Sequence, residues 1–307
     1  MFLKHKVEFI KFKFEMYKQI AENKRRTIIL IIAFVLMIAV IAVAFAWVYN
    51  DVWIAVWTIV VAVVYAVIQY FAAGSLATAM TGAKEITKKD NPRLYNVVEN
   101  LSITTGLPMP KVYIVHDSAP NAFATGRDPK HAVVAATTGL LDIMSDKELT
   151  AVMAHEMSHV KNYDIRVSMI VFGLTCVVGL ISDIAFRMMF YGNRRRNDEG
   201  SPMGYILVVV AAILSPILAA IAQMAVSRQR EYLADASAVN ITRYPEGMID
   251  ALKKLQSHTQ PMKSQNVAAA SMYINDPLRK GFFNNLLSTH PPIEKRIERL
   301  ENGKKNF

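Results

Sequence analysis

Residues 145–172 read SDKELTAVMAHEMSHVKNYDIRVSMIVF, and the interpretation of the whole chain starts from this stretch. It contains no Gly or Pro, and Ser145 and Glu148 have the S-x-x-E spacing of a capping box at a helix start. We therefore expect one uninterrupted helix from Ser145 to residue 172. Residues four apart share a helix face, so His155 and His159 would present both imidazoles to the same side.

Residues 155–159 form an H-E-x-x-H pattern. Two histidines at this spacing can bind one zinc ion, and Glu156 is placed to reach an activated water molecule rather than the metal. A carboxylate in that position can act as a general base in hydrolysis. A fortuitous match on an ordinary helix is the alternative, and a third ligand elsewhere in the chain would argue against it.

Residues 227–235, Ser-Arg-Gln-Arg-Glu-Tyr-Leu-Ala-Asp, offer that third ligand. Glu231 and Asp235 are four apart on a predicted helix, so Glu231 can bind the metal while Asp235 accepts the free N–H of a ligand histidine. An exposed acidic helix face near two arginines is the alternative. With the upstream pattern, we expect one Zn²⁺ per chain, held by His155, His159 and Glu231.

Four apolar segments predict a membrane protein, in agreement with 53% hydrophobic residues and a net charge of +10 in 307 residues. Residues 27–48 and 52–73 are uncharged, and each would span about 33 Å as a helix. Residues 205–226 form another uncharged segment. Residues 167–182 form a shorter one, which continues through Asp183 and Arg187 to Phe190 and could also be a buried core helix. We expect two transmembrane hairpins. A cleaved signal peptide is the alternative for the first segment, but its length argues against it.

Positive charge around these segments sets the expected orientation. Residues 1–26 carry eight Lys/Arg against three Glu, so the positive-inside rule places the N-terminus and the region after residue 73 in the cytoplasm. Arg194–Arg196 conflict with this orientation, because it puts them outside, unless the second hairpin does not fully cross. The N-terminal residues form either a basic amphipathic helix on the lipid surface or an exposed charged tail.

Other function classes lack support in the sequence. The single cysteine, Cys176, excludes a disulfide scaffold. We find no phosphate-binding glycine loop and no basic stretch interleaved with aromatic residues, so we expect no nucleic-acid partner. The positive charge instead indicates contact with a lipid bilayer.

Three motifs carry a resemblance to a known family: HEMSHVKN at residues 155–162, EYLAD at 231–235 and THPPIEKR at 289–296. They resemble the HtpX family of integral-membrane zinc metalloproteases, a group that includes the more distant CAAX prenyl proteases. The resemblance implies a protease that acts in quality control of misfolded or damaged membrane proteins, as part of a stress response.

The resemblance also implies roles for individual residues. Glu156 would be the general base and Asp235 the group that orients a ligand histidine. His290 would hydrogen-bond the oxyanion, Arg296 would contact the carboxylates of the site, and Asn162 would lie around the metal ligands.

Residues 121–126, Asn-Ala-Phe-Ala-Thr-Gly, resemble the edge strand with which zinc proteases pair substrate backbone. The β-branched content of residues 111–115 and 132–137 predicts strands beside it. An ordinary loop before a hairpin is the alternative. The expected substrate-binding residues are Asn121, Ala122 and Phe123.

The expected fold is a mainly α membrane protein with four transmembrane helices in two hairpins and a cytoplasmic α+β protease domain with a small β-sheet, of the gluzincin type (HExxH plus Glu). The expected parts are a basic amphipathic arm (1–26), the first hairpin (27–73), the first part of the protease domain with the HExxH helix (74–166), the second hairpin (167–226) and the second part with the third zinc ligand (227–307).

The expected function is that of a membrane-bound zinc endopeptidase in the cell membrane, with its active site on the cytoplasmic side and membrane proteins as substrates. A CAAX-type processing protease and a non-catalytic membrane scaffold with a metal site are the alternatives. Structural zinc sites normally have four protein ligands, often Cys, which argues against the scaffold. Cleavage specificity, oligomeric state and control of access to the site leave no sign in the sequence.

Overall fold

The computed structural model describes residues 20–36, 38, 39, 42, 43, 46, 50–173, 176, 228–263, 272–275 and 291–303. Several sequence-based predictions lie outside these residues: the first part of the N-terminal arm (1–19), most of the second hairpin, Arg194–Arg196 and His290.

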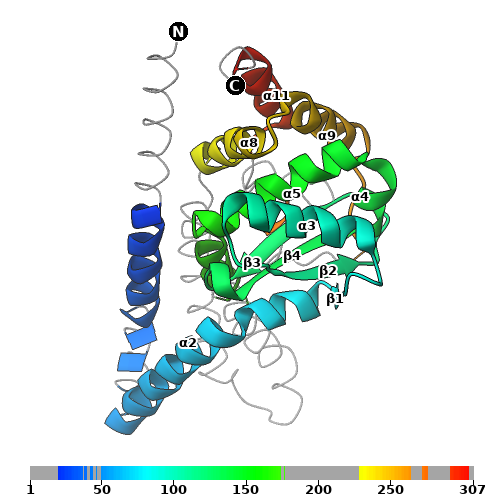
Figure 1. Cartoon of the computed structure of the whole chain (residues 1–307). Helices are drawn as coiled ribbons and strands as arrows, with labels where there is room; N and C mark the ends of the chain where they lie inside the picture. The colour runs from blue at the N-terminus through cyan, green and yellow to red at the C-terminus, as the bar shows by residue number, and fades with distance from the viewer. Residues whose placement is uncertain are drawn as a thin grey trace, which may run out of the picture.

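A four-stranded mixed sheet lies at the base of the main body (Figure 1). Its strands follow the order β1 (Lys84–Glu85), β2 (Lys111–Val115), β4 (Ala132–Thr137) and β3 (Ala122–Gly126). β2 and β4 are parallel, whereas β1 and β3 pair antiparallel with their neighbours. The strands predicted over residues 111–115 and 132–137 are confirmed. Within this sheet β3 is an edge strand, as predicted.

Most helices of the body lie above the sheet in the view of Figure 1, some in contact with its strands and others packed on those helices. They are α3 (Pro92–Thr105), α4 (Thr138–Ile143), α5 (Asp146–Lys161), α8 (Arg228–Thr242), α9 (Pro245–Ser257) and α11 (Ile293–Gly303). α5 contacts α3, α8 and α9 as well as β3 and β4, so it is the central helix of the body. Because neighbours surround it, apolar residues on different faces of α5, such as Leu149, Val152 and Met157, are fully buried.

The start of α5 is confirmed. The Ser145 backbone N–H donates to Glu148 Oε2 (2.6 Å), and the Glu148 backbone N–H donates to Ser145 Oγ (3.4 Å). Lys254 of α9 also donates to Glu148 Oε2 (2.7 Å), which ties the first turn of α5 to its neighbour. The capping box therefore fixes both the first residue of the helix and its packing.

The expectation of one uninterrupted helix from Ser145 to residue 172 is wrong. α5 ends at Lys161, and Asn162 and Tyr163 form a turn in which Tyr163 has φ 61°. The chain is helical again from Asp164. In an uninterrupted helix, side chains five residues apart point about 140° away from each other. The turn instead allows Asp164 to fold back toward the end of α5.

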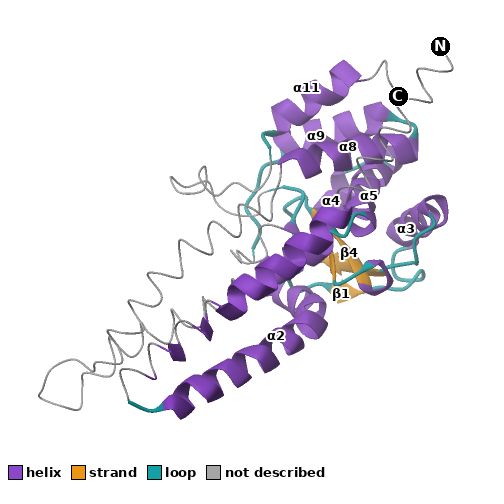
Figure 2. Cartoon of the chain, turned by 90° about the vertical axis from the view of Figure 1, so that its left-hand side faces the viewer, coloured by secondary structure: helices purple, strands orange, loops and turns teal. Residues whose placement is uncertain are grey.

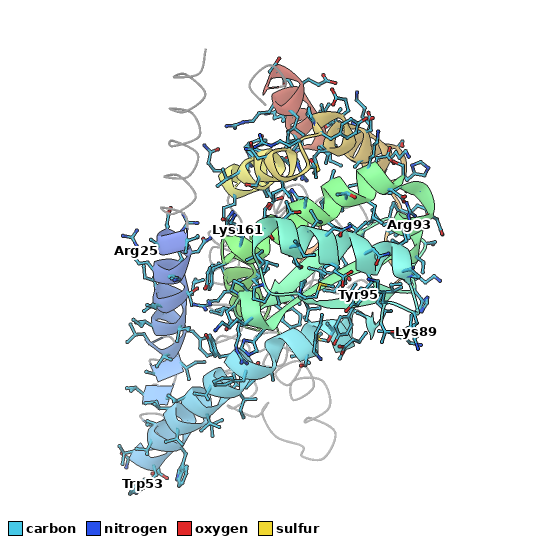
Figure 3. All side chains as sticks on the ribbon, viewed as in Figure 1. Arg25, Trp53, Lys89, Arg93, Tyr95 and Lys161 are labelled. Atoms are coloured by element: carbon cyan, nitrogen blue, oxygen red, sulfur yellow. The ribbon has the colours of Figure 1, made fainter. Side chains whose placement is uncertain are left out.

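Two long helices leave the body and converge at a turn of residues 50–51 (Figures 1 and 2). The first comprises residues 20–36, and the described residues from there to 46 are helical as well. The second is α2 (Val52–Met80). Asp51 caps its start, and the Asp51 carboxylate accepts the Trp53 N–H (2.9 Å). Trp53 lies at the far tip of α2 (Figure 3).

The composition of α2 fits a lipid environment. Among the described residues, one helical window, Ala55–Ala72, is long and apolar enough to cross a membrane, with a mean hydropathy of 2.0. Its large side chains face outward: Trp57 is 64% exposed and Phe71 61%. A continuous exposed apolar helix surface is expected of a helix in contact with lipid. By length and hydropathy, the described residues thus contain one of the four predicted transmembrane helices.

Gly139 occupies a close approach between α4 and the loop after β2. A Cβ at Gly139 would lie 2.0 Å from the Ser118 carbonyl oxygen. We expect Gly139→Ala to push α4 away from this loop and to lower the free energy of unfolding by about 1–3 kcal/mol, as overpacking does. The melting temperature in detergent measures this loss. Gly74→Ala is the control, because Gly74 is also a helical glycine without a positive φ, and a Cβ there would come no closer than 3.9 Å to another part of the chain. Equal losses in the two variants would contradict the clash.

Candidate metal centre and active site

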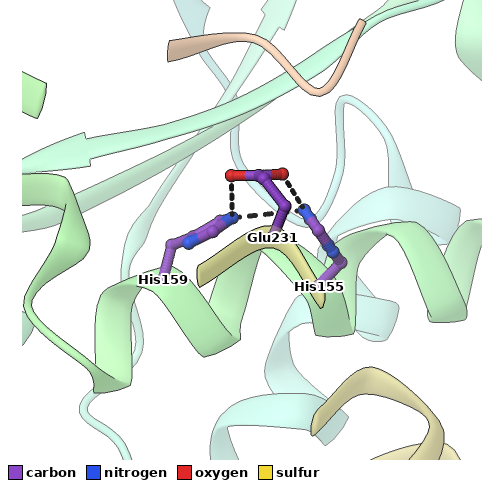
Figure 4. A group of neighbouring side chains, drawn as sticks. All are labelled: His155, His159 and Glu231. Carbon is purple, nitrogen blue, oxygen red and sulfur yellow. Dashed lines mark hydrogen bonds and ion pairs between the residues drawn. The ribbon is translucent and has the colours of Figure 1, made fainter. Parts of the chain in front are cut away.

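His155, His159 and Glu231 bring three potential ligand atoms together between α5 and α8 (Figure 4). The two Nε2 atoms are 3.2 Å apart, and they lie 3.5 Å (His155) and 3.6 Å (His159) from the Glu231 carboxylate oxygens. Atoms that bind one ion tetrahedrally at roughly 2.1 Å lie about 3.4 Å from each other. The separations match this value, so the three residues can hold one metal ion.

The other ring nitrogen of His155 contacts a buried carboxylate. His155 Nδ1 lies 2.9 Å from Asp235 Oδ1, one helical turn beyond Glu231 on α8. Arg296 of α11 donates to the same carboxylate through Nε (2.9 Å to Oδ2) and Nη2 (2.6 Å to Oδ1). Asp235 and Arg296 are almost completely buried. The structure therefore brings together Asp235 and Arg296, two of the residues that sequence analysis placed around the ligands.

Charges in this buried cluster shift its pKa values. Burial alone lowers the pKa of His155, but its hydrogen bonds with Asp235 and Glu231 outweigh burial and raise that pKa to about 9. Burial raises the pKa of Asp235, but the charge of Arg296 outweighs burial and lowers it to about 2. Asp235 is therefore an anion at neutral pH, and an anionic partner makes the His155 imidazole a stronger electron donor to a metal.

Glu156 shares a small cavity with the three potential ligands. The cavity has a volume of about 20 Å³, and its lining includes His155, His159 and Glu231. Glu156 is buried, and burial raises the pKa of its carboxyl group. This volume suits about one water molecule. The site thus combines a metal-binding triad, a buried carboxylate and room for water.

The Peptidase family M48 profile matches residues 88–304. The chain belongs to peptidase family M48. The Protease HtpX homolog of Tropheryma whipplei (strain Twist) is 52% identical over 289 residues, which cover 93% of this chain and 98% of that protein. The Protease HtpX homolog of Streptococcus gordonii is 44% identical over 293 residues, 93% of this chain and 99% of that protein. The predicted resemblance is confirmed, and the chain is an HtpX-like metalloprotease.

A likeness of fold extends to a solved structure. The crystal structure of S. mikatae Ste24p matches with a TM-score of 0.51 at 19% identity, over 93% of this chain and 67% of that one. The exposed apolar helix α2 agrees with a membrane-bound metalloprotease of this family.

Sequence analysis missed two residues of this metalloprotease site, Asp164 and Arg230. Asp164 Oδ2 lies 2.9 Å from His159 Nδ1, and Arg230 Nη1 lies 3.5 Å from Asp164 Oδ1. Asn162, which sequence analysis placed around the ligands, caps α5, and its side-chain oxygen has no hydrogen-bond partner among the described residues. The sequence did contain a sign of Asp164, because a carboxylate at the start of an apolar segment needs a polar or charged partner.

The predicted substrate-binding edge of β3 is covered by another part of the chain. Residues 272–275 lie along it: Tyr273 pairs antiparallel with Phe123, and the Ile274 N–H donates to the Ala122 carbonyl (2.9 Å). The Asn121 side chain donates to the Asn275 carbonyl (2.9 Å) and accepts from its N–H (3.1 Å). Residues 272–274 also line the cavity beside Glu156. In this structure, the three predicted substrate-binding residues thus contact the protein's own backbone.

Arg296→Ala tests the buried pair beside the metal-binding residues. The substitution leaves the Asp235 carboxylate buried without its guanidinium partner, so we expect unfolding to become easier by about 3–5 kcal/mol. We also expect zinc affinity to fall about 10–100-fold, since Asp235 no longer holds His155 in place. Thermal unfolding and competition with a zinc chelator measure the two effects.

The control for this substitution is Arg299→Ala on the same helix. Arg299 is exposed and stacks over the Tyr232 ring at 4.5 Å. Zinc affinity should stay unchanged in this variant. An Arg296→Ala protein with the affinity of the Arg299→Ala protein would show that the buried pair does not support the site.

Proposed function

We propose that this M48 metalloprotease is a membrane-bound, zinc-dependent endopeptidase that hydrolyses misfolded or damaged membrane proteins. The observation that supports this proposal is the combination in one buried site of the His155, His159 and Glu231 triad with the Glu156 carboxylate. The triad lies beside a strand edge that can pair with a peptide of any sequence. It lies in a body joined to an exposed apolar helix.

Zinc is the metal that this donor set fits best. Two imidazoles and one carboxylate leave a fourth position for water, which is the usual arrangement in catalytic zinc sites. Asp235 and Asp164 contact the remaining ring nitrogens of His155 and His159, and so hold both imidazoles with Nε2 toward the centre. A zinc ion bound there supplies Lewis-acid activation of water and of the substrate carbonyl.

Glu156 moves the proton in the proposed reaction. It accepts a proton from the attacking water as the water oxygen bonds to the carbonyl carbon of the scissile peptide. It then passes that proton to the amide nitrogen while the C–N bond breaks. Because burial raises its pKa, Glu156 holds the proton more readily between the two steps. His290, which lies outside the described residues, would donate to the oxyanion, and this role rests on the family resemblance.

The proposed arrangement in the cell membrane extends what α2 shows. We propose four spans in two hairpins, over residues 27–73 and 167–226, with an N-terminal arm (1–26) and the two parts of the protease domain (74–166 and 227–307) on the cytoplasmic side. Both ends of the second hairpin then lead directly to the ligands of the metal. A site so close to the bilayer would act on proteins in or beside it.

The substrate backbone would pair with β3 in place of residues 272–275. The cavity of about 20 Å³ beside Glu156 is too small for a peptide, so a substrate has to displace part of its lining. The bond from the Ile274 N–H to the Ala122 carbonyl is the kind of contact that a substrate strand would form. The covering segment therefore marks where the substrate would bind.

Glu156→Gln tests the proposed chemistry. It keeps the size of the side chain but removes the proton acceptor, so cleavage should fall by about 10²–10⁴-fold while zinc content stays at one per chain. The purified full-length protein is assayed with an unfolded soluble protein, a misfolded membrane protein and a short prenylated peptide. Unchanged cleavage would overturn the role of Glu156.

Two other outcomes of that assay identify the alternatives. Cleavage of only the prenylated peptide would favour a CAAX-type processing protease. Zinc retention without cleavage by either form would favour a non-catalytic scaffold. Wild-type cleavage of the unfolded and membrane proteins, lost in the variant, supports the proposal.

A reversible disulfide tests whether substrate replaces residues 272–275. Phe123 and Tyr273 form a non-hydrogen-bonded antiparallel pair, in which Cα atoms lie about 4.5 Å apart and a disulfide can form. In a Cys176→Ser background, we expect the oxidised Phe123→Cys/Tyr273→Cys protein to lose cleavage by at least about tenfold, because the segment can no longer leave β3. Reduction should restore it.

The control is the single Phe123→Cys protein in the same background, treated with the same oxidant and reductant. It accounts for loss of the Phe123–Tyr273 ring contact, whose centroids are 5.1 Å apart. If the oxidised double variant cleaves as fast as its reduced form, substrate does not bind in place of this segment.

A further inference from the structure

Asn23 lies in the charged first part of the first helix (residues 20–36), and it is buried against the body. It is 1% exposed and lies on the buried face of the helix together with Thr27, Leu30 and Phe34. It also lies outside the residues matched by the family profile, which begin at residue 88. A buried amide without hydrogen bonds is costly, so the partners of Asn23 matter.

The partners of Asn23 are at the turn that ends α5. Asn23 Nδ2 donates to Asp164 Oδ1 (2.6 Å) and to the Asn162 carbonyl (2.9 Å). Lys24, the next residue, places its Nζ over the Tyr163 ring, 4.8 Å from the centroid. The first helix thus contacts both residues of the turn, Asn162 and Tyr163, and also Asp164, which follows it.

The Asp164 carboxylate connects this turn to the triad. Its Oδ2 lies 2.9 Å from His159 Nδ1. Its Oδ1 accepts the hydrogen bond from Asn23 Nδ2 and lies 3.5 Å from Arg230 Nη1. The orientation of the His159 ring therefore depends on where the carboxylate is held. Because Asp164 follows a turn rather than continuing α5, the helix alone does not fix it.

We propose that Asn23 is a positioning residue for the metal site: it holds the Asp164 carboxylate against His159, so that the first helix completes a site otherwise built by the peptidase domain. This inference rests on the proposed role of His159 as a metal ligand. It assigns a residue of the N-terminal helix, about 130 positions before the HExxH motif, to the support of its second histidine.

The test compares Asn23→Ala with wild type in the full-length protein. Removal of the amide frees the carboxylate, so we expect zinc affinity to fall about tenfold, at the lower end of the effect of outer contacts on metal ligands. In the Co²⁺-substituted protein, the visible absorption bands should shift, since they report the ligand geometry. Asp164→Asn should give a similar shift, and Asn23→Ala should add little to it.

Thr27→Val is the matched control. Thr27 lies one turn further on the same buried face, and its Oγ1 donates to the Asn23 carbonyl rather than to Asp164 (2.9 Å). It should lower the melting temperature without a change in zinc affinity or in the Co²⁺ spectrum. If Asn23→Ala behaves like Thr27→Val, Asn23 only anchors the helix and the proposal is wrong.

His159→Ala separates this inference from the proposed function. If metal binding survives in His159→Ala, His159 is not a ligand, and both the proposed metal site and the role of Asn23 fail. If His159→Ala loses the metal while Asn23→Ala keeps wild-type affinity and spectrum, only the positioning role fails.

Discussion

The site depends on one buried carboxylate that joins three helices. Asp235 of α8 contacts His155 of α5 and accepts two hydrogen bonds from Arg296 of α11. A buried charge has to be paired, so each of the three helices can be placed in only one position relative to the other two. That requirement sets Glu231, one turn away, against the histidines of α5. The geometry of the triad thus follows from an ion pair that would not itself contact the metal.

Structural features that depend on residues close in sequence, or on local hydrogen bonding, were predicted well. The capping box at Ser145, the shared face of His155 and His159, and the strands of residues 111–115 and 132–137 depend on short-range patterns, and all appear in the structure. The contact of Asp235 with a ligand histidine was predicted from its spacing to Glu231. The contact of Arg296 with the carboxylates of the site was predicted only through the family resemblance, because nothing in local periodicity brings α11 to α8.

The prediction that failed concerns a place where a contact with a distant part of the chain outweighs the local preference for helix. Residues 145–172 have the composition of one helix, yet Tyr163 adopts a left-handed conformation and Asp164 bonds to His159. Helix propensity is a fraction of a kcal/mol per residue, whereas a buried carboxylate without a partner costs several, so the distant contact decides the local structure. Likewise, no sequence pattern shows that residues 272–275 pair with β3, since a strand edge accepts almost any extended segment. Chain length and hydropathy predict membrane spans but not which helix face packs on the body, as Asn23 illustrates.

The segment on the edge of β3 has a kinetic consequence. It belongs to the same chain as the site, so its effective concentration there does not change when the protein is diluted. A competitor that binds the same edge has to exceed this internal competitor in concentration or in affinity. Under the proposed function, an unfolded segment of a neighbouring membrane protein, confined to the same two-dimensional surface, would reach a higher local concentration at this edge than a soluble peptide present in the same amount. The bilayer would then select substrates by confinement, without any recognition of their sequence.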